Sequence, residues 1–318
     1  MIQLLPVKCL LMQHRSPQSE IDRIDCVVVV PAFNEVARIG RCLSSIAISN
    51  LPDGYKLSEI VVADGASTDG TVTEVQRWSG ENPGLHITIS TSSLRRGKAG
   101  DLGNFHTSEL LKMSDDEIVV ICDADVAVRP GSLRALLESF TQKPSIAVAF
   151  GADFPDNCQR GRWASSFQMS AVTAFGKAAG DAVPRAYGRF FAYRIAALKD
   201  FTWSPDRGPD DLQLLVFIES NSISCRSVWS ATVDVTPAGN YRDFYYQTAR
   251  GRLAAARTKA GKTSIRSRLA PFRTAVEHPH WAVAYCAARL ASIVQRVFSP
   301  TKFENVWVPP SSTKTPLS

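Results

Sequence analysis

The stretch Glu117-Ile-Val-Val-Ile-Cys-Asp-Ala-Asp125 is an apolar run that ends in two carboxylates spaced one residue apart. A run without polar alternation is typical of a strand that is buried on both faces of a parallel sheet. Ligands of such sheets bind beyond the carboxyl ends of the strands, where Asp123 and Asp125 are expected to lie. Unpaired carboxylates are unfavourable at the edge of a core, and a divalent cation that carries phosphate is a suitable partner for them. The alternative is that both acids are turn and N-cap residues of a helix that begins near Pro130.

Two similar apolar runs precede this stretch. Cys26-Val-Val-Val-Val30 predicts a buried strand that ends in the turn Pro31-Ala-Phe-Asn-Glu35, and residues 57–63 predict a second strand that ends at Asp64. Apolar residues at helical spacing follow each strand, at 36–49 and 71–78, with Thr68 or Asp69 as the expected cap of the second helix. A short strand at 85–90 and a helix to about residue 112 continue the alternation.

This alternation of strand and helix predicts a doubly wound α/β sheet with right-handed crossovers. Parallel strands bring their carboxyl ends to one edge of the sheet. Glu35, Asp64, Asp123 and Asp125 are therefore expected to meet there. No Gly-x-Gly-x-x-Gly follows the first strand, which argues against a dinucleotide-dependent oxidoreductase.

Composition is that of a globular protein of 318 residues, with 45% hydrophobic and 21% charged residues. The net charge of +6 is concentrated late in the chain. Residues 240–273 contain nine basic residues and one acid, a local charge of +8. Clustered basic residues of this kind are attracted to anionic lipid, whereas nothing in the sequence indicates a nucleic-acid partner.

Seven cysteines without a Cys-x-x-Cys pair favour a reducing, cytoplasmic compartment. Residues 1–12 are apolar but lack a basic region and a small-residue cleavage site, so we do not expect a signal peptide. Translation from Met1 or from Met12 fits equally well, and residues 1–23 are predicted to be a flexible leader. The sequence has no uninterrupted run of 18 apolar residues, so a membrane-spanning helix is not expected.

Six motifs follow one another between residues 26 and 252. They are Val-Val-Val-Val-Pro-Ala-Phe-Asn-Glu35, Val-Val-Ala-Asp-Gly-Ala-Ser-Thr-Asp-Gly-Thr71, Gly97-Lys-Ala-Gly-Asp-Leu102, Asp-Ala-Asp125, Pro209-Asp-Asp-Leu212 and Gln247-Thr-Ala-Arg250. In this order they resemble the family 2 glycosyltransferases. The resemblance implies a GT-A-type fold, a doubly wound and mostly parallel sheet flanked by helices, here with a C-terminal helical extension. It also implies an inverting transfer of a hexosyl or N-acetylhexosaminyl group from a nucleotide-diphosphate sugar to an acceptor hydroxyl.

The resemblance implies roles for particular residues of the nucleotide-binding half. A UDP-sugar is favoured as donor over a GDP-sugar, with Mn²⁺ or Mg²⁺ as the divalent metal. The expected donor-binding residues are Pro31, Phe33, Glu35, Asp64, Lys98 and Asp123. Asp125 is expected to contact the metal, with Asp123 towards the ribose or a metal-bound water. Many members have a second acid at the position of Gly65, so the base preference is left open.

In the other half, the resemblance assigns the general base to Asp211, with Asp210 as its supporting neighbour. Acids in a first helical turn also complement the helix dipole without any catalytic role. Gln247 and Arg250 share one face of a predicted helix and are expected to hold the acceptor or the donor diphosphate, although a basic, solvated helix is the alternative. The tryptophan that follows this motif in membrane-associated members is replaced by Gly251, which favours a non-processive enzyme.

The predicted organisation is a catalytic domain at 24–260, divided into a nucleotide-binding half at 24–125 and an acceptor half at 126–260 with an acceptor wall at 153–187. Residues 261–308 are predicted to form a basic linker and an amphipathic helix at 281–298, and 309–318 a disordered tail. That helix could dock on its own domain, pair with another subunit or lie on the inner face of a membrane. His278 and His280 are too isolated to predict a metal site.

Two other function classes stay open at the level of sequence. A sugar-phosphate nucleotidyltransferase has a similar sheet but requires a Gly-rich, basic signature after the first strand, which the turn 31–35 lacks. A catalytically inactive, nucleotide-binding partner in a membrane-associated assembly is compatible with Gly65 and Gly251.

Overall fold

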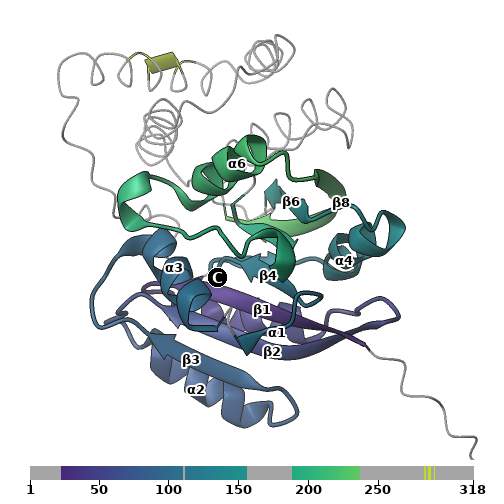
Figure 1. The fold of residues 1–318 in the computed structure, drawn as a ribbon. Coiled ribbons are helices and arrows are strands. Elements are labelled where there is room, and N and C mark those ends of the chain that lie inside the picture. Colours follow the sequence, from purple (N-terminus) through teal and green to yellow (C-terminus); the bar gives the residue numbers. More distant parts are fainter. Residues whose placement is uncertain are drawn as a thin grey trace, which may run out of the picture.

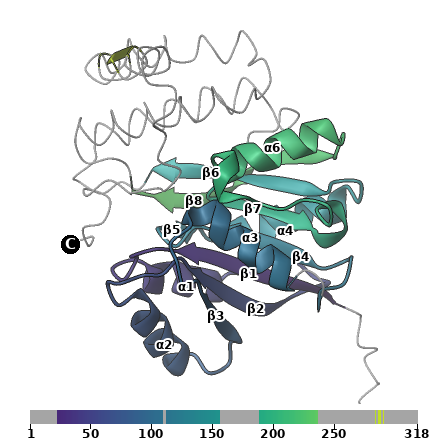
Figure 2. The same ribbon diagram turned by 60° about the vertical axis from the view of Figure 1, so that its left-hand side comes forward.

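A computed structural model of the chain describes residues 23–109, 112–155 and 188–236, together with Val283, Cys286, Ala287 and Leu290. These residues form one eight-stranded sheet with helices on both faces (Figures 1 and 2). The strand order is β3-β2-β1-β4-β7-β6-β8-β5. The predicted α/β class is confirmed.

Strands and helices alternate through the first half of the chain, as the sequence predicts. The strands are β1 (Ile24–Ala32), β2 (Tyr55–Asp64), β3 (Ile87–Thr91), β4 (Ile118–Cys122), β5 (Val126–Val128), β6 (Val148–Pro155), β7 (Phe190–Arg194) and β8 (Cys225–Val235). The helices are α1 (Ile39–Ala47), α2 (Thr71–Glu81), α3 (Gly97–Glu109), α4 (Ser132–Gln142) and α6 (Asp210–Ser220). Two 3₁₀ turns occupy Ile195–Ala197 and Pro205–Arg207.

The sheet has a parallel half and a mixed half. β3, β2, β1 and β4 are all parallel, so their carboxyl ends share one edge. β7 then pairs antiparallel with β4, with Val119 opposite Tyr193. This reversal brings the start of β7 beside the end of β4, and the backbone N–H of Asp123 donates to the carbonyl of Arg189 at 2.9 Å. The parallel half and the mixed half of the sheet are therefore joined at this edge.

The continuous apolar runs serve two cores, one on each face of the sheet. In β1, Cys26, Val28 and Val30 pack with α1, α2 and α4, while Val27 and Val29 pack with α3 and α6 on the opposite face. The five residues of β4 divide in the same alternating way, and all are fully buried. A strand covered on both faces has no polar side to show in its sequence, which explains the runs at 26–30 and 118–122.

One local interpretation differs from the structure. α4 begins at Ser132, after β5 and after Gly131, which has a left-handed φ of 79° at the N-cap position. Asp123 and Asp125 are separated from that helix by a whole strand, so their interpretation as its N-caps is wrong.

The capping prediction for α2 is met in modified form. Gly70 takes the N-cap position with a left-handed φ of 95°, and it has no side chain to accept a hydrogen bond. The carboxylate of Asp69 instead accepts from the backbone N–H of Thr71 at 3.0 Å and from that of Val36 at 3.2 Å. Asp69 thus ties the start of α2 to the turn after β1.

Several predictions lie outside the described residues: the leader, most of the acceptor wall, Gln247 and Arg250, the basic linker and the tail. Within the described part of the chain, no helix has the length and apolar character needed to cross a membrane.

Candidate active site

A pocket opens at the carboxyl edge of the parallel strands, between the ends of β1, β2 and β4 and the start of α3. Six residues predicted from the sequence line it: Pro31, Phe33, Glu35, Lys98, Asp123 and Asp125. A seventh, Asp64, is 1% exposed and immediately precedes the lining residue Gly65. The parallel topology therefore brings together the side chains that the sequence placed at three separate strand ends.

The turns after β1 and β2 hold each other in place. Asn34 has a left-handed φ of 53° and its N–H donates to the hydroxyl of Ser67 at 2.9 Å. In return, the side-chain carbonyl of Asn34 accepts from the backbone N–H of Thr68 at 2.8 Å. The N–H of Glu35 donates to the hydroxyl of Thr71 at 2.8 Å. These bonds fix the position of Glu35 at the rim of the pocket.

The two acids after β4 have different surroundings, although only buried Ala124 lies between them. Asp123 forms an ion pair with Lys98, whose ammonium lies 2.7 Å from its Oδ1. Burial raises the pKa of Asp123 to about 7, against the opposing effect of Lys98. Among the described residues, the carboxylate of Asp125 makes no hydrogen bond or ion pair and faces the pocket.

Lys98 links the two halves of the site. Its ammonium also lies 2.8 Å from Oδ2 of Asp210, at the start of α6, and it donates to the carbonyl of Gly188. Burial favours the neutral amine, but the charges of Asp123 and Asp210 outweigh this effect and raise the pKa of Lys98. The sequence predicts Lys98 to be a donor-binding residue; among the described residues its partners are the carboxylates of Asp123 and Asp210 and the carbonyl of Gly188.

The start of α6 is held against β7 and presents Asp211 beside this ion pair. A Cβ atom on Gly188 would lie 3.0 Å from that of Asp211, so the two backbones approach closely only because residue 188 has no side chain. Buried Gln213 donates to the carbonyls of Ser204 and Gly208 and orders the loop before the helix. Burial, and secondly the charge of Asp210, raises the pKa of Asp211 to about 6.

Three further charged residues of the site were not singled out from the sequence. Arg189 pairs with Asp153, and the charges of Asp153, Asp125 and Asp123 raise its pKa. Arg95 lies over the ring of Phe33, with its guanidinium carbon 3.7 Å from the ring centroid. Asp101 lines the pocket from α3 and is 4% exposed. Asp101 lies inside the motif 97–102. Its acidic side chain within that motif was the one feature of the sequence that could have identified it as a site residue.

The described residues contain no group of three His, Cys, Asp or Glu side chains that could enclose a metal ion. A cation that keeps most of its coordination for phosphate and water needs only one or two protein carboxylates. Asp125, facing the pocket and unengaged in the described part of the chain, fits that requirement, with Asp123 beside it.

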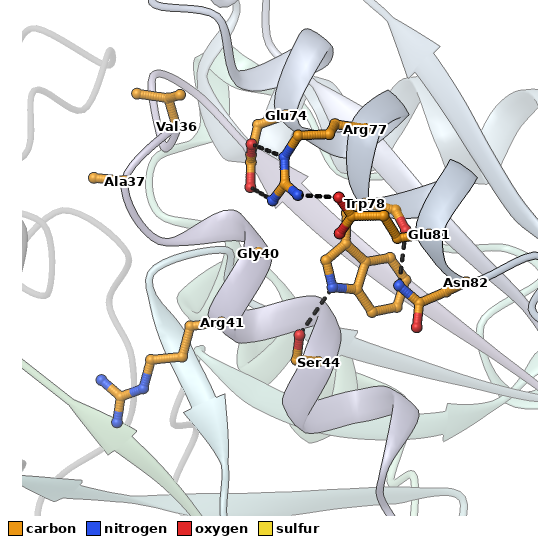
Figure 3. A pocket seen from close by; sticks show the side chains of 10 residues that line it. All are labelled: Val36, Ala37, Gly40, Arg41, Ser44, Glu74, Arg77, Trp78, Glu81 and Asn82. Atoms are coloured by element: carbon orange, nitrogen blue, oxygen red, sulfur yellow. Dashed lines mark hydrogen bonds and ion pairs between the residues drawn. The ribbon is translucent and has the colours of Figure 1, made fainter.

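A second hollow lies away from these acids, between α1 and α2 (Figure 3). Its charged groups satisfy one another, because the guanidinium of Arg77 binds both Glu74 and Glu81. The indole N–H of Trp78 donates to the hydroxyl of Ser44 at 2.8 Å. This arrangement stabilises the contact between the two helices and does not present reactive groups.

Comparison with known proteins identifies relatives of this arrangement. The sequence profile of the family described as "Glycosyl transferase family 2" matches residues 27–202. The fold is similar to that of the mannosyltransferase PcManGT from Pyrobaculum calidifontis in complex with GDP-Man and Mn²⁺, with a TM-score of 0.56, 22% identity, and coverage of 87% of this chain and 82% of that one. It is also similar to glucosyl-3-phosphoglycerate synthase from Mycobacterium tuberculosis in complex with Mn²⁺, UDP and phosphoglyceric acid, with a TM-score of 0.51, 18% identity, and coverage of 77% and 83%.

Among curated sequences, an uncharacterized protein of Methanocaldococcus jannaschii is 32% identical over 129 residues. The match covers 41% of this chain, which spans about half the length of that relative, 47%.

Replacement of Lys98 by methionine should lower the free energy of unfolding by about 2–4 kcal/mol at neutral pH, because two largely buried carboxylates lose their counter-charge. The loss should shrink towards about pH 5, where protonated Asp123 no longer needs a cation. Urea unfolding with a chelator present measures both effects. The control is Lys199→Met, which removes an exposed ion pair with Asp115 and should change stability by less than about 1 kcal/mol. Equal effects of the two variants would contradict this role for Lys98.

Proposed function

The chain belongs to glycosyl transferase family 2, and from this membership we propose that it moves a hexosyl or N-acetylhexosaminyl group from a nucleotide-diphosphate sugar to an acceptor hydroxyl. The observation that carries the proposal is the meeting of Asp123 and Asp125 with Asp210 and Asp211 around Lys98. Acids suited to a metal–diphosphate group thus lie next to an acid suited to act as a base.

The pocket supports a nucleotide as the donor. The ring of Phe33, covered by Arg95, provides an aromatic wall at the end of β1. Glu35 and Asp64 are buried carboxyl groups at the ends of β1 and β2, suited to accept from N–H or hydroxyl groups of a base or ribose. Two structures of similar fold are complexes with a guanine and a uracil nucleotide respectively, which supports a UDP-sugar or a GDP-sugar as donor.

We assign the divalent metal, Mn²⁺ or Mg²⁺, to Asp125 with help from Asp123. Both fold relatives contain Mn²⁺, and a bound cation of this kind supplies charge neutralisation for the departing diphosphate. The contribution of the chain itself is to keep Asp125 open to the pocket, while Lys98 and Arg189 balance the surrounding negative charge.

Asp211 is the proposed general base of an inverting transfer. A single displacement at the anomeric carbon needs a carboxylate to take the acceptor proton as the acceptor oxygen attacks. Asp211 is the better placed of the two acids on α6, because Asp210 is already paired with Lys98. With a pKa raised to about 6, Asp211 is mostly ionised at neutral pH and yet basic enough to bind a proton.

Gln247, Arg250 and Gly251 lie outside the described residues, so their roles in holding the acceptor or diphosphate and in a non-processive reaction stay proposals from sequence.

We further propose that the basic C-terminal region meets an anionic membrane surface. Val283, Cys286, Ala287 and Leu290 are helical, lie on one helix face by their spacing, and are exposed. Exposed apolar residues next to a segment of charge +8 support attachment to lipid rather than docking on the domain. The full chain should co-sediment with anionic liposomes and a form ending at Gly261 should not; equal co-sedimentation of the two forms would reject the proposal.

Replacement of Asp125 by alanine should abolish metal-dependent binding of a nucleotide diphosphate, because the pocket loses its unengaged carboxylate. A thermal-shift panel of nucleotide sugars with and without Mn²⁺ detects this, since a ligand that binds only the folded state raises the unfolding midpoint. Asp200→Ala, at an exposed acid remote in sequence from the motifs, is the matched control and should bind like the wild type. Unchanged binding by Asp125→Ala would remove the metal assignment.

Replacement of Asp211 by asparagine should leave donor binding within about twofold and lower turnover by about 10²-fold or more, because the acceptor proton has no base to receive it. In the wild type, turnover should rise with pH through about 6 as Asp211 ionises. Asp206→Asn, at an exposed acid before α6, should keep full turnover. Release of nucleotide diphosphate measures the rate. If a wild-type chain that binds the donor shows no turnover with any acceptor panel, an inactive nucleotide-binding partner becomes the better description.

A further inference from the structure

Gly65, where many members of the family have an acid, lies against the side chain of Asp101. A Cβ atom on residue 65 would lie 2.6 Å from Oδ2 of Asp101 and 3.3 Å from its Cγ. The three atoms nearest to such a Cβ all belong to the carboxyl group of Asp101. Gly65 does not have a left-handed φ, so its lack of a side chain serves this contact and not a turn. The carboxyl group of Asp101, projecting from α3, thus occupies the room that an acid at position 65 would need.

The surroundings of Asp101 hold it at the wall of the pocket. Its Oδ1 accepts from the hydroxyl of Ser92 at 3.2 Å, and Ser92 in turn accepts from Asn104 at 3.2 Å. Asp64 lies next to Gly65 and is buried; its Oδ2 accepts from the N–H of Ser67 at 3.2 Å. Its Oδ1 has no hydrogen-bond partner among the described residues. Two buried carboxyl groups therefore lie near each other with unused hydrogen-bonding capacity.

Asp101 and Gly65, the neighbour of Asp64, line the same pocket as Asp123 and Asp125. β2 and β4 are separated by β1 alone, and strands are spaced about 4.8 Å apart, so the two ends are about 10 Å apart along the sheet edge. With the diphosphate at Asp125, the remaining length of a nucleotide reaches towards β2 and places its base near Asp64 and Asp101.

We propose that Asp101, seated in the room that Gly65 leaves, determines the choice of nucleobase in the donor pocket by donating a hydrogen bond to a base carbonyl. The neighbouring oxygen of Asp64 then accepts from the adjacent N–H. A carbonyl beside an N–H is the pairing edge of uracil and of guanine, which adenine and cytosine lack. This inference rests on the proposed use of a nucleotide-diphosphate donor.

The protonation state of Asp101 agrees with the role of donor. Burial, and then the charge of Asp64, raise its pKa to about 7, while Ser92 and Arg95 act in the opposite direction. The acid form, which can donate, is therefore the main form below about pH 7 and is lost as pH rises above it. The other titratable groups that line the pocket nearby are Glu35 and Lys98. Asparagine at position 101 keeps an N–H donor in nearly the same shape but does not titrate.

The test measures binding of UDP, GDP, CDP and ADP with Mn²⁺ to the full chain by titration calorimetry. At about pH 6, Asp101→Ala should bind UDP or GDP about tenfold more weakly, and CDP and ADP nearly as before. Asp101→Asn should stay within about threefold of the wild type. From about pH 6 to about pH 8 the wild type should lose about fivefold more affinity than Asp101→Asn, a comparison that cancels the titration of the ligand, Asp123 and Asp211. Of UDP and GDP, the nucleotide that loses more affinity through Asp101→Ala contains the base that the pocket prefers.

A swap of the two positions tests the geometry. Gly65→Asp alone should weaken binding and lower the unfolding midpoint, because its Cβ meets Asp101. Gly65→Asp combined with Asp101→Ala should recover most of the affinity lost by Asp101→Ala, since the carboxyl group re-enters the same space from β2. Recovered affinity supports the proposal even if Asp101→Ala proves less stable than the wild type. The double variant also contains Asp101→Ala, so a loss of stability caused by that substitution would weaken binding in both variants.

Each possible result of these experiments either supports or overturns the inference. Equal affinities of Asp101→Ala and wild type for all four nucleotides, equal pH dependence of wild type and Asp101→Asn, or no recovery in the swap would overturn the inference about Asp101 while leaving the glycosyltransferase proposal intact. Failure of the wild type to bind any of the four nucleotides would instead overturn the proposed donor class.

Discussion

The ammonium of Lys98 is the contact on which the site depends. Parallel β-strands and the start of α6 bring Asp123, Asp125, Asp210 and Asp211 to one edge of the sheet, where like charges in a partly buried setting repel one another. Lys98 lies between Asp123 and Asp210 at 2.7 and 2.8 Å and so joins the end of β4 to the start of α6. Arg189, paired with Asp153, supplies the second positive charge. The same ion pairs thus stabilise the folded domain and hold the acids of the site together.

Much of the fold could be predicted from sequence because its strongest signals are local. Runs such as 26–30 and 118–122 mark strands that are covered on both faces, and each is followed by a helix or a polar turn. The order and direction of the strands in the mixed half of the sheet have no such local signal in the sequence. Whether β7 pairs antiparallel with β4, or β8 lies between β6 and β5, is decided by contacts between segments far apart in the chain. The interpretation of Asp123 and Asp125 as N-caps of α4 failed for a related reason, since the three-residue strand β5, which separates them from that helix, has too few residues to show a period.

The candidate site likewise has residues that sequence motifs predict and residues that only the structure identifies. Residues carried by motifs, such as Glu35, Lys98 and Asp125, were predicted and do line one pocket. Arg95, Asp101 and Arg189 were missed because their importance lies in contacts through space: a guanidinium over the ring of Phe33, a carboxyl group in the room beside Gly65, an ion pair with Asp153. The sequence did show that an acid is missing at position 65, but only the structure shows which side chain occupies that room.

The proposed function gives two acids of this site different tasks, and their surroundings explain how each acid is suited to its task. Burial raises the pKa of both, to about 7 for Asp101 and to about 6 for Asp211. The higher value, supported by Asp64 behind it, keeps Asp101 suited to donate to a nucleobase. The lower value leaves Asp211 ionised at neutral pH and able to take a proton from an acceptor hydroxyl. The carboxylates of Asp123 and Asp125 and the cation Lys98 line the same pocket as Asp101. The proposed function assigns donor recognition to the β2 side and proton transfer to the α6 side of this edge. A single residue type can serve recognition and catalysis in one pocket because position, rather than identity, sets its proton affinity.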